Sequence, residues 1–413
     1  MKNNLLIAQS GGPTTAINAT LSGILKLASI SNKVDSVYAA KNGIEGVLNE
    51  QFINVEDLIK DVDALNKLSL TPGAALGSCR YKLKDISEDC KEYKKIINIL
   101  IKHEISYFIY IGGNDSMDTV AKLSQYCEEN NIKDIKIIGA PKTIDNDLEE
   151  IDHAPGFGSA AKYIGTTFAE LERDILAYES KSVTIVEVMG RNTGWLTAAS
   201  ALSRLNGNVG PSLIYLCEKV FDENKFIEDV KEKLKKQNAI IVAVSEGVKT
   251  KDGNYLCSKN EIKNQASDMF GHSYIAGVGK YLEQVVKTEI GCKVRSIELS
   301  LMQRCAMQTA SATDITESTM LGMKALQLAL EGKTGQMASL KRGNGERYKV
   351  EYISVPIEKV ANKEKKVPID WINQNGNDIK TDLLNYLFPL IQGEINLTYS
   401  NGIPQQYKFV NIQ

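Results

Sequence analysis

Residues 107–127 read YFIYIGGNDSMDTVAKLSQYC, and this stretch decides the interpretation of the fold. It opens with a continuous apolar run, Tyr107–Ile111, which is typical of a buried strand. Gly112 and Gly113 follow directly. Small and apolar side chains then recur three and four positions apart, as on one face of a helix, at Met117, Val120, Ala121, Ser124 and Cys127. A strand, a glycine turn and a helix in this order form the unit from which parallel α/β sheets are built.

The same unit recurs along the chain. Further strands are predicted at Asn4–Ala8, Ile135–Ala140, Val183–Val188 and Ala239–Val244. Further helices are predicted over Ile17–Ala28, Ala160–Ile175 and Gly194–Arg204. A hairpin is predicted where Met337–Arg342 and Arg347–Ile353 flank Gly343–Gly345. The pattern predicts an α/β fold of two Rossmann-like lobes with parallel sheets and a C-terminal extension, with ligands at the carboxyl ends of the strands.

Composition restricts the class of protein. The 413 residues are 43% hydrophobic and 24% charged, which is ordinary for a globular chain and excludes a disordered or collagen-like one. Lys+Arg 49 against Asp+Glu 51 gives a net charge of −2, which argues against nucleic acid or an anionic membrane as the main partner. No apolar run approaches the roughly 18–20 residues of a membrane span.

Cysteine and histidine usage gives a second set of expectations. The 7 cysteines are scattered without a C-x-x-C pair, which predicts free thiols in a reducing compartment. With only 3 histidines, a histidine-rich metal site is not expected. The opening MKNNLLIAQSGG is too short in apolar residues for a signal peptide, so we expect a cytoplasmic protein.

Polar motifs follow the predicted strands. Ser10–Pro13 offers glycine backbone N–H groups to a phosphate at a helix start, although a tight turn would look the same. In Gly112–Ser116, Asn114 and Asp115 offer oxygens to a hard cation such as Mg²⁺. The plainer interpretation is that Asp115 or Ser116 only caps the helix.

The segment Pro141–Asp147 carries the densest chemistry. Its carboxylates, Asp145 and Asp147, follow a buried strand, and a carboxylate there can accept a proton from an attacking hydroxyl. Lys142 can hold a phosphate and offset charge on a transferred phosphoryl group. A polar turn is the alternative.

Further motifs suit a phosphorylated sugar: Met189–Arg191, Ser245–Gly247, Arg295 and Gln303–Arg304. An arginine suits a phosphate, and Glu246 suits sugar hydroxyls, although each residue alone could be structural. Together with the glycine turns, the motifs indicate phosphoryl transfer, which needs little beyond positioning and charge.

In these motifs, and in Leu76–Arg80, the chain resembles the phosphofructokinase family over about residues 1–360. The resemblance implies a phosphate-donor lobe at 1–150, completed by about 305–360, a fructose 6-phosphate lobe at 151–304, and an extension at 361–413. It also implies a homo-oligomer, with a dimer favoured.

The resemblance implies a role for each matching residue. Asp145 is the expected proton acceptor, aided by Asp115 and Lys142, and Asn114 matches a metal ligand. Donor contacts are implied for Gly12 and Arg80. Fructose 6-phosphate contacts are implied for Thr143, Ile144, Asp147, Met189, Gly190, Arg191, Glu246, Arg295, Leu301 and Arg304.

The chain departs from the usual family pattern at three positions. Asn114 replaces an aspartate, and Leu301 replaces a histidine found in many members. Ser182 replaces an arginine that a neighbouring subunit often supplies, and Lys181 is a candidate substitute.

Asp115 and Lys142 also indicate which phosphate donor is used. In the family that this chain resembles, members that use ATP typically carry glycine at both positions. A carboxylate at Asp115 would repel the α-phosphate of ATP, so the resemblance implies diphosphate as donor, with Mg²⁺ and a reversible reaction. The alternatives are ATP as donor, a lipid or NAD kinase, and a catalytically inactive sugar-phosphate sensor. A dehydrogenase is disfavoured because no G-x-G-x-x-G follows the first strand.

Overall fold

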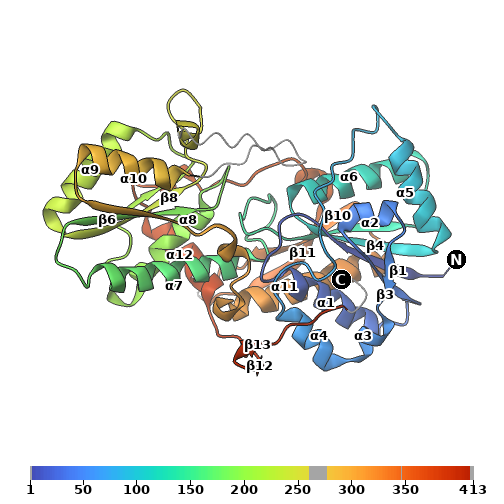
Figure 1. The fold of residues 1–413 in the computed structure, drawn as a ribbon. Coiled ribbons are helices and arrows are strands. Elements are labelled where there is room, and N and C mark those ends of the chain that lie inside the picture. The colour runs from blue at the N-terminus through green and yellow to red at the C-terminus, as the bar shows by residue number, and fades with distance from the viewer. Residues whose placement is uncertain (1, 260–276, 346, 410–413) are drawn as a thin grey trace. The chain divides into compact units, whose positions relative to one another are not determined.

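The computed structural model describes residues 2–259, 277–345 and 347–409 (Figure 1). The chain divides into two compact units. Unit 1 comprises Met1–Gly156, Ala312–Glu364 and Gly393–Gln413. Unit 2 comprises Phe157–Ser311 and Lys365–Gln392. The chain therefore passes between the units after residues 156, 311, 364 and 392.

Unit 1 is built on a seven-stranded sheet of order β11-β10-β5-β4-β1-β2-β3. Its strands are β1 (Asn4–Gln9), β2 (Val37–Ala40), β3 (Phe52–Asn54), β4 (Ile105–Gly112), β5 (Lys136–Pro141), β10 (Gln336–Arg342) and β11 (Val350–Pro356). From β10 to β2 the neighbours pair in parallel, whereas β3 and β11 run antiparallel at the two edges. The unit is therefore a mixed sheet with a parallel centre, and the predicted hairpin forms its β10–β11 edge.

Helices cover this sheet on both faces, as α/β patterning requires. They are α1 (Ile17–Ile30), α2 (Gly43–Leu48), α3 (Glu56–Lys60), α4 (Val62–Ser69), α5 (Lys91–Lys102), α6 (Asn114–Glu129), α11 (Ala312–Leu330) and the 3₁₀ turn Ile357–Lys359. Figure 1 shows α1 and α11 side by side. A Cβ on Gly23 would lie 2.0 Å from the Thr319 carbonyl oxygen, and one on Gly322 would lie 2.1 Å from that of Thr20, so glycine is what allows this close packing.

Unit 2 has a four-stranded parallel sheet of order β7-β8-β6-β9. The strands are β6 (Ser182–Val188), β7 (Leu213–Tyr215), β8 (Ala239–Ser245) and β9 (Lys293–Glu298). The helices are α7 (Phe157–Ile175), α8 (Trp195–Ala199), α9 (Glu223–Lys236), α10 (Val278–Glu289) and α12 (Thr381–Leu387). Shorter 3₁₀ segments lie at Ser200–Gly207, Leu256–Lys259, Ser300–Arg304, Met307–Thr309, Ile369–Trp371 and Phe388–Ile391.

The residues after 360 do not form one body. Within unit 2, Trp371 and Tyr386 pack with Trp195 of α8, with ring centroids 5.1–6.2 Å apart. Within unit 1, the Tyr407 N–H donates to Thr71 Oγ1 at 2.8 Å, beyond a small hairpin of β12 (Tyr399–Ser400) and β13 (Ile403–Pro404). The C-terminal stretch is therefore divided between the two units instead of standing as a separate extension.

All the predicted strands are confirmed, with ends that differ by up to three residues; the largest difference is at β11, predicted at Arg347–Ile353. The predicted helix at Gly194–Arg204 is confirmed as α8 followed by a 3₁₀ segment. Within the described ranges, no helix has the length and apolarity needed to cross a bilayer.

Candidate active site

Four predicted motifs of unit 1 meet at the carboxyl ends of β1, β4 and β5. The Ser10 N–H donates to the Ile111 carbonyl at 2.9 Å, and the Gly11 N–H donates to that of Cys79 at 3.2 Å. The Lys142 N–H donates to the Gly112 carbonyl at 2.8 Å. These contacts bring together the turn after β1, the loop before Arg80, the turn after β4 and the loop after β5.

Lys142 is the central cation of this half-site. Its side chain is buried, and Nζ donates to the Gly12 carbonyl at 2.7 Å. Gly11 has φ +76°, and a Cβ there would lie 3.1 Å from Nζ, so glycine at this position both allows the turn and leaves room for the ammonium. A lysine ammonium is thus fixed at a glycine turn, and its positive charge suits an anion there.

Asn114 opens α6, and its carboxamide is bound to the segment that leaves unit 1. Its Oδ1 accepts from the Asn362 N–H at 2.7 Å, and its Nδ2 donates to the Lys363 carbonyl at 2.5 Å. The Asn114 oxygen would have to share its lone pairs between the Asn362 N–H and a metal, and its role as a metal ligand stays a prediction. Among the described residues, no three acidic, histidine or cysteine side chains gather into a metal site. Asp115 lies in the same first turn and is partly exposed.

One face of α6 ties these loops together. Asp118 accepts from the Asn362 side chain at 2.7 Å and pairs with Lys122 at 2.9 Å. Lys122 also donates to the Leu83 carbonyl at 3.0 Å and so holds the loop that follows the exposed Arg80. Asp118 and Lys122 are not among the predicted site residues, although the spacing of four from Asn114 to Asp118 to Lys122 is a signal visible in the sequence.

Asp145 lies on a loop that is closed at its neck. The Thr143 N–H donates to the Pro155 carbonyl at 3.1 Å, and Thr143 Oγ1 accepts from the Asp145 N–H at 3.1 Å. Asn146 has φ 53° and is fully buried, and its Oδ1 accepts from the Ala154 N–H at 2.9 Å. Asp145 and Asp147 are partly exposed, whereas the Ile144 side chain points into the core. The loop therefore presents its carboxylates and buries its apolar member.

A second group of predicted residues gathers in unit 2, at the turn after β6. The Met189 N–H donates to Gln303 Oε1 at 3.2 Å, and the Gly190 N–H donates to Glu246 Oε1 at 3.1 Å. Ser245 Oγ donates to the Gly190 carbonyl at 2.7 Å. Glu246 and Gln303 therefore shape the turn that carries Arg191. Gln303, whose amide is buried, was predicted only as part of a sugar-phosphate motif and not as a residue that holds this turn.

Glu187, near the end of β6, fixes the start of α10. Its carboxylate accepts the Gly277 N–H at 3.2 Å and the Gly279 N–H at 2.7 Å. Burial raises the pKa of this carboxyl to about 7, although both hydrogen bonds act in the other direction.

Three predicted residues lie on or after β9, the edge strand of this sheet. Arg295 pairs in register with Thr184, four residues before β6 ends at Val188, which is about 13 Å at 3.3 Å per residue. The structure of unit 2 therefore does not bring Arg295 to the Met189–Arg191 turn. Leu301 is 57% exposed, and Arg304 closes the following 3₁₀ turn.

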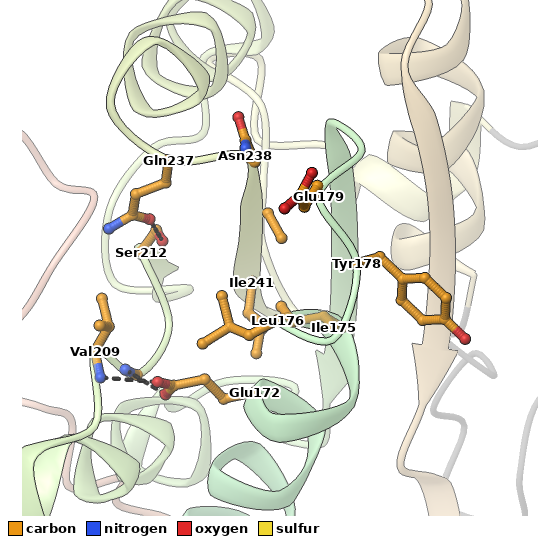
Figure 2. A pocket seen from close by; sticks show the side chains of 12 residues that line it. Glu172, Ile175, Leu176, Tyr178, Glu179, Val209, Ser212, Gln237, Asn238 and Ile241 are labelled. Carbon is orange, nitrogen blue, oxygen red and sulfur yellow. Dashed lines mark hydrogen bonds between the residues drawn. The ribbon is translucent and has the colours of Figure 1, made fainter.

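A cavity of about 320 Å³ lies in unit 2, where β8 begins at Ala239 and α7 ends (Figure 2). Glu172 is buried in its wall, and its carboxylate accepts the N–H groups of Val209 and Gly210 at 3.0 and 2.7 Å. The cavity is otherwise lined largely by apolar side chains such as Leu176 and Ile241. None of the predicted site residues lines it.

The fold and these loops define an α/β protein that presents glycine turns and acid-bearing loops at the carboxyl ends of two sheets. The family model described as Phosphofructokinase matches residues 4–329. The chain belongs to the phosphofructokinase family.

Individual relatives are similar over nearly their whole length. A protein of Halomonas elongata named pyrophosphate--fructose 6-phosphate 1-phosphotransferase is 38% identical over 410 residues, covering 98% of this chain and 96% of the relative. The crystal structure of a pyrophosphate-dependent phosphofructokinase from Nitrosospira multiformis matches with a TM-score of 0.88 and 34% identity, covering 99% of this chain and 97% of that one. The crystal structure of a pyrophosphate-dependent phosphofructokinase from Marinobacter aquaeolei matches with a TM-score of 0.87 and 36% identity, covering 100% of this chain and 97% of that one.

Proposed function

We propose that the protein transfers a phosphoryl group from diphosphate to the 1-hydroxyl of fructose 6-phosphate. The hydroxyl oxygen forms a bond to one phosphorus atom of diphosphate, and the bond from that phosphorus to the bridging oxygen breaks. The bridging oxygen leaves with the electron pair as part of phosphate, and the hydroxyl proton passes to a carboxylate. The products are fructose 1,6-bisphosphate and phosphate, and the reaction is reversible.

The observation that carries the proposal is Lys142, a buried ammonium held at the Gly12 carbonyl, 2.7 Å away, beside a glycine turn. A fixed cation there suits the charge that grows on departing phosphate, and it needs no reorganisation as the reaction proceeds. Asp115 completes the donor side, because its negative charge and bulk disfavour the α-phosphate of a nucleotide.

Asp145 is the group we assign as proton acceptor. Its backbone is fixed by Thr143, and its side chain is only partly buried, so the carboxylate is accessible to a sugar hydroxyl. Asp147, Thr143 and the backbone at Ile144 would contact the same sugar, with Gly12 and Arg80 on the diphosphate.

The Met189–Arg191 turn, Glu246 and Arg304 would bind the phosphate and hydroxyls of the sugar. Arginine suits the 6-phosphate because its guanidinium can bind two phosphate oxygens at once. In this assignment unit 1 supplies the donor contacts, the proton acceptor and part of the sugar contacts, and unit 2 supplies the remaining sugar contacts.

Mg²⁺ is the proposed cofactor, carried chiefly by the oxygens of diphosphate. This agrees with the way Mg²⁺ is usually bound, through substrate phosphates with few protein ligands. It also accommodates Asn114, whose oxygen accepts from the Asn362 N–H. The ion would neutralise charge on the donor, and we assign no chemical step to it.

We propose a homodimer working in the cytoplasm. Arg295 lies on an exposed edge strand away from its own turn, so a second copy is a reasonable recipient for it. Exposed apolar side chains at this end of unit 2, Leu176 at 51%, Tyr178 at 60% and Val209 at 56%, suit burial against that copy. The seven cysteines are free thiols, which suits a reducing compartment.

The deciding experiment gives purified protein Mg²⁺, fructose 6-phosphate and matched diphosphate or ATP, and follows fructose 1,6-bisphosphate in a coupled assay. Turnover with diphosphate alone is the expected result. Turnover with ATP would overturn the donor assignment while leaving the acceptor assignment intact. Turnover with neither donor, combined with intact binding of fructose 6-phosphate, would favour a sugar-phosphate sensor.

A further inference from the structure

A buried histidine lies between two carboxylates in unit 1. His153 is 2% exposed, and its Nδ1 lies 2.8 Å from Asp152 Oδ1. Its Nε2 lies 2.6 Å from Glu317 Oε2, on α11. An ionised carboxylate only accepts hydrogen bonds, and both ring nitrogens donate only when the ring is protonated. The geometry is therefore that of an imidazolium held at both ends.

The charged groups around this histidine balance it. Arg342 of β10 donates to Asp152 at 2.9 Å, and the Tyr348 hydroxyl donates to Glu317 at 2.8 Å. With His153 protonated, two positive charges face two negative ones. Burial by itself lowers the pKa of His153, but the hydrogen bonds and charges of Asp152 and Glu317 outweigh it and raise the pKa above its ordinary value of 6.5.

This cluster fastens the outer end of the loop that carries Asp145. The Asp152 N–H donates to the Leu340 carbonyl at 3.1 Å, and Ser339 Oγ donates to the Glu150 carbonyl at 2.6 Å, so β10 holds one side of the loop. On the side facing α11, the Gly156 N–H donates to Asp314 at 2.9 Å. His153 supplies the charged link between the loop and α11.

We propose that His153 is a positioning residue, which fixes the loop of residues 142–156 so that Asp145 faces its substrate in one orientation. The proposal rests on the function assigned above, because it takes Asp145 as the proton acceptor. His153 touches no substrate in this scheme, and it acts only through the loop. Loss of its proton leaves the carboxylates of Asp152 and Glu317 on either side of a neutral ring, with Arg342 as the cation that pairs with Asp152, and the loop then loosens.

The test combines hydrogen exchange with kinetics on the full-length chain. In His153→Gln, amide exchange over residues 143–156 should speed up at least tenfold, and kcat should fall at least tenfold. In the unmodified protein, protection of this loop, corrected for the intrinsic rate, should decline as the pH rises through the raised pKa of His153. Protection in the variant should show no such step.

His103→Gln is the matched control. His103 also pairs with a glutamate, Glu50, at 2.7 Å, but its side chain is 34% exposed and lies after α5. The His103→Gln variant should leave both kcat and the amide hydrogen exchange of residues 143–156 unchanged.

Three outcomes decide the proposal. Loop protection that is independent of pH in the unmodified protein would overturn it, and this measurement needs no variant to fold. An unchanged loop in His153→Gln would overturn it as well. If Asp145→Asn retained full turnover while His153→Gln still loosened the loop, the assignment of Asp145 would fail and the role of His153 in holding the loop would stand.

Discussion

The loops that follow β5 and β6 leave similar buried strands but are held in different ways. The loop at 142–156 is long, and charged side chains fasten its outer end through Asp152, His153 and Glu317. The turn at Met189–Arg191 is short, and it is held at its backbone by Glu246, Gln303 and Ser245. A loop held by charges should respond to pH, whereas a turn held by close backbone contacts should respond to added volume.

The largest effect is expected at Asp145. Asp145→Asn should lower kcat by roughly 10²–10⁴-fold, because it removes the proton acceptor. Binding of fructose 6-phosphate, measured by calorimetry, should be preserved, because the turn in unit 2 is untouched. Glu150→Gln is the control, since Glu150 is an exposed acid of the same loop. A full kcat in Asp145→Asn would mean that another group accepts the proton.

Added volume should damage the turn in unit 2. Gly190 has φ +129°, and a Cβ there would lie 2.4 Å from the Thr193 carbonyl oxygen. Gly190→Ala should therefore displace Arg191 and raise the KM for fructose 6-phosphate by roughly 10–100-fold. The KM for diphosphate should change little.

Gly291→Ala separates crowding from backbone strain in this experiment. Gly291 also has positive φ, +72°, but a Cβ there meets no atom within 4 Å. Equal losses in the two variants would show that strain alone explains the effect.

Donor choice should depend on unit 1 alone. Asp115→Gly removes a negative charge beside the donor, and it should improve use of ATP relative to diphosphate by about tenfold, which corresponds to about 1.4 kcal/mol. The ratio of kcat/KM values for the two donors measures this directly. An unchanged ratio would place the exclusion of ATP elsewhere in the site.

The smallest effect concerns stability and Glu187. Its pKa is raised from 4.5 to about 7, so the folded protein binds more protons than the unfolded chain in that interval. The contribution of Glu187 to stability therefore declines as the pH rises from 4.5 to about 7. Glu187→Gln should flatten this decline.

At pH 8 the free energy of unfolding of Glu187→Gln should differ from that of the unmodified protein by about 1 kcal/mol or less, because glutamine accepts fewer hydrogen bonds from Gly277 and Gly279. Urea unfolding at pH 5 and pH 8 measures it. An identical pH dependence in both proteins would contradict the assignment of the titration to Glu187.

His153 should show a pH dependence of the same sign as that of Glu187. With a raised pKa, its contribution is complete below pH 6.5 and is lost as the pH rises through the folded-state value. Both groups therefore weaken the protein on the alkaline side, one by losing a favourable charge and the other by acquiring an unfavourable one.

Local pattern explains which parts of the molecule could be predicted. The strands β1, β4 and β5 are continuous apolar runs, and β1 and β4 lead through glycine turns into helices with periodic apolar residues, so the sequence alone predicts them. The strands β3 and β7 have three residues each, which is too short to show a periodicity, and β9 alternates in exposure at an edge.

Long-range pairings left no trace in the sequence. Asn114 and Lys363 lie 249 residues apart, and His153 and Glu317 lie 164 apart. Neither contact has a spacing that a reading of neighbouring residues could detect. For the same reason, the sequence predicts Asn114 as a metal ligand from its place in a motif, and only the folded chain shows its hydrogen bonds to residues 362 and 363.

The passage of the chain between the units has a consequence for synthesis on the ribosome. All the strands of unit 2 come from one continuous stretch, Phe157–Ser311. In the sheet of unit 1, the outer edge of β5 has no neighbouring strand until the ribosome has made β10, which begins at Gln336. At 5–20 residues per second, the edge of β5 waits on the order of 10–40 s for its neighbour. An unpaired strand edge invites pairing with other chains, so this interval is when a nascent chain most needs shielding. The unit that is begun first is thus the one completed last.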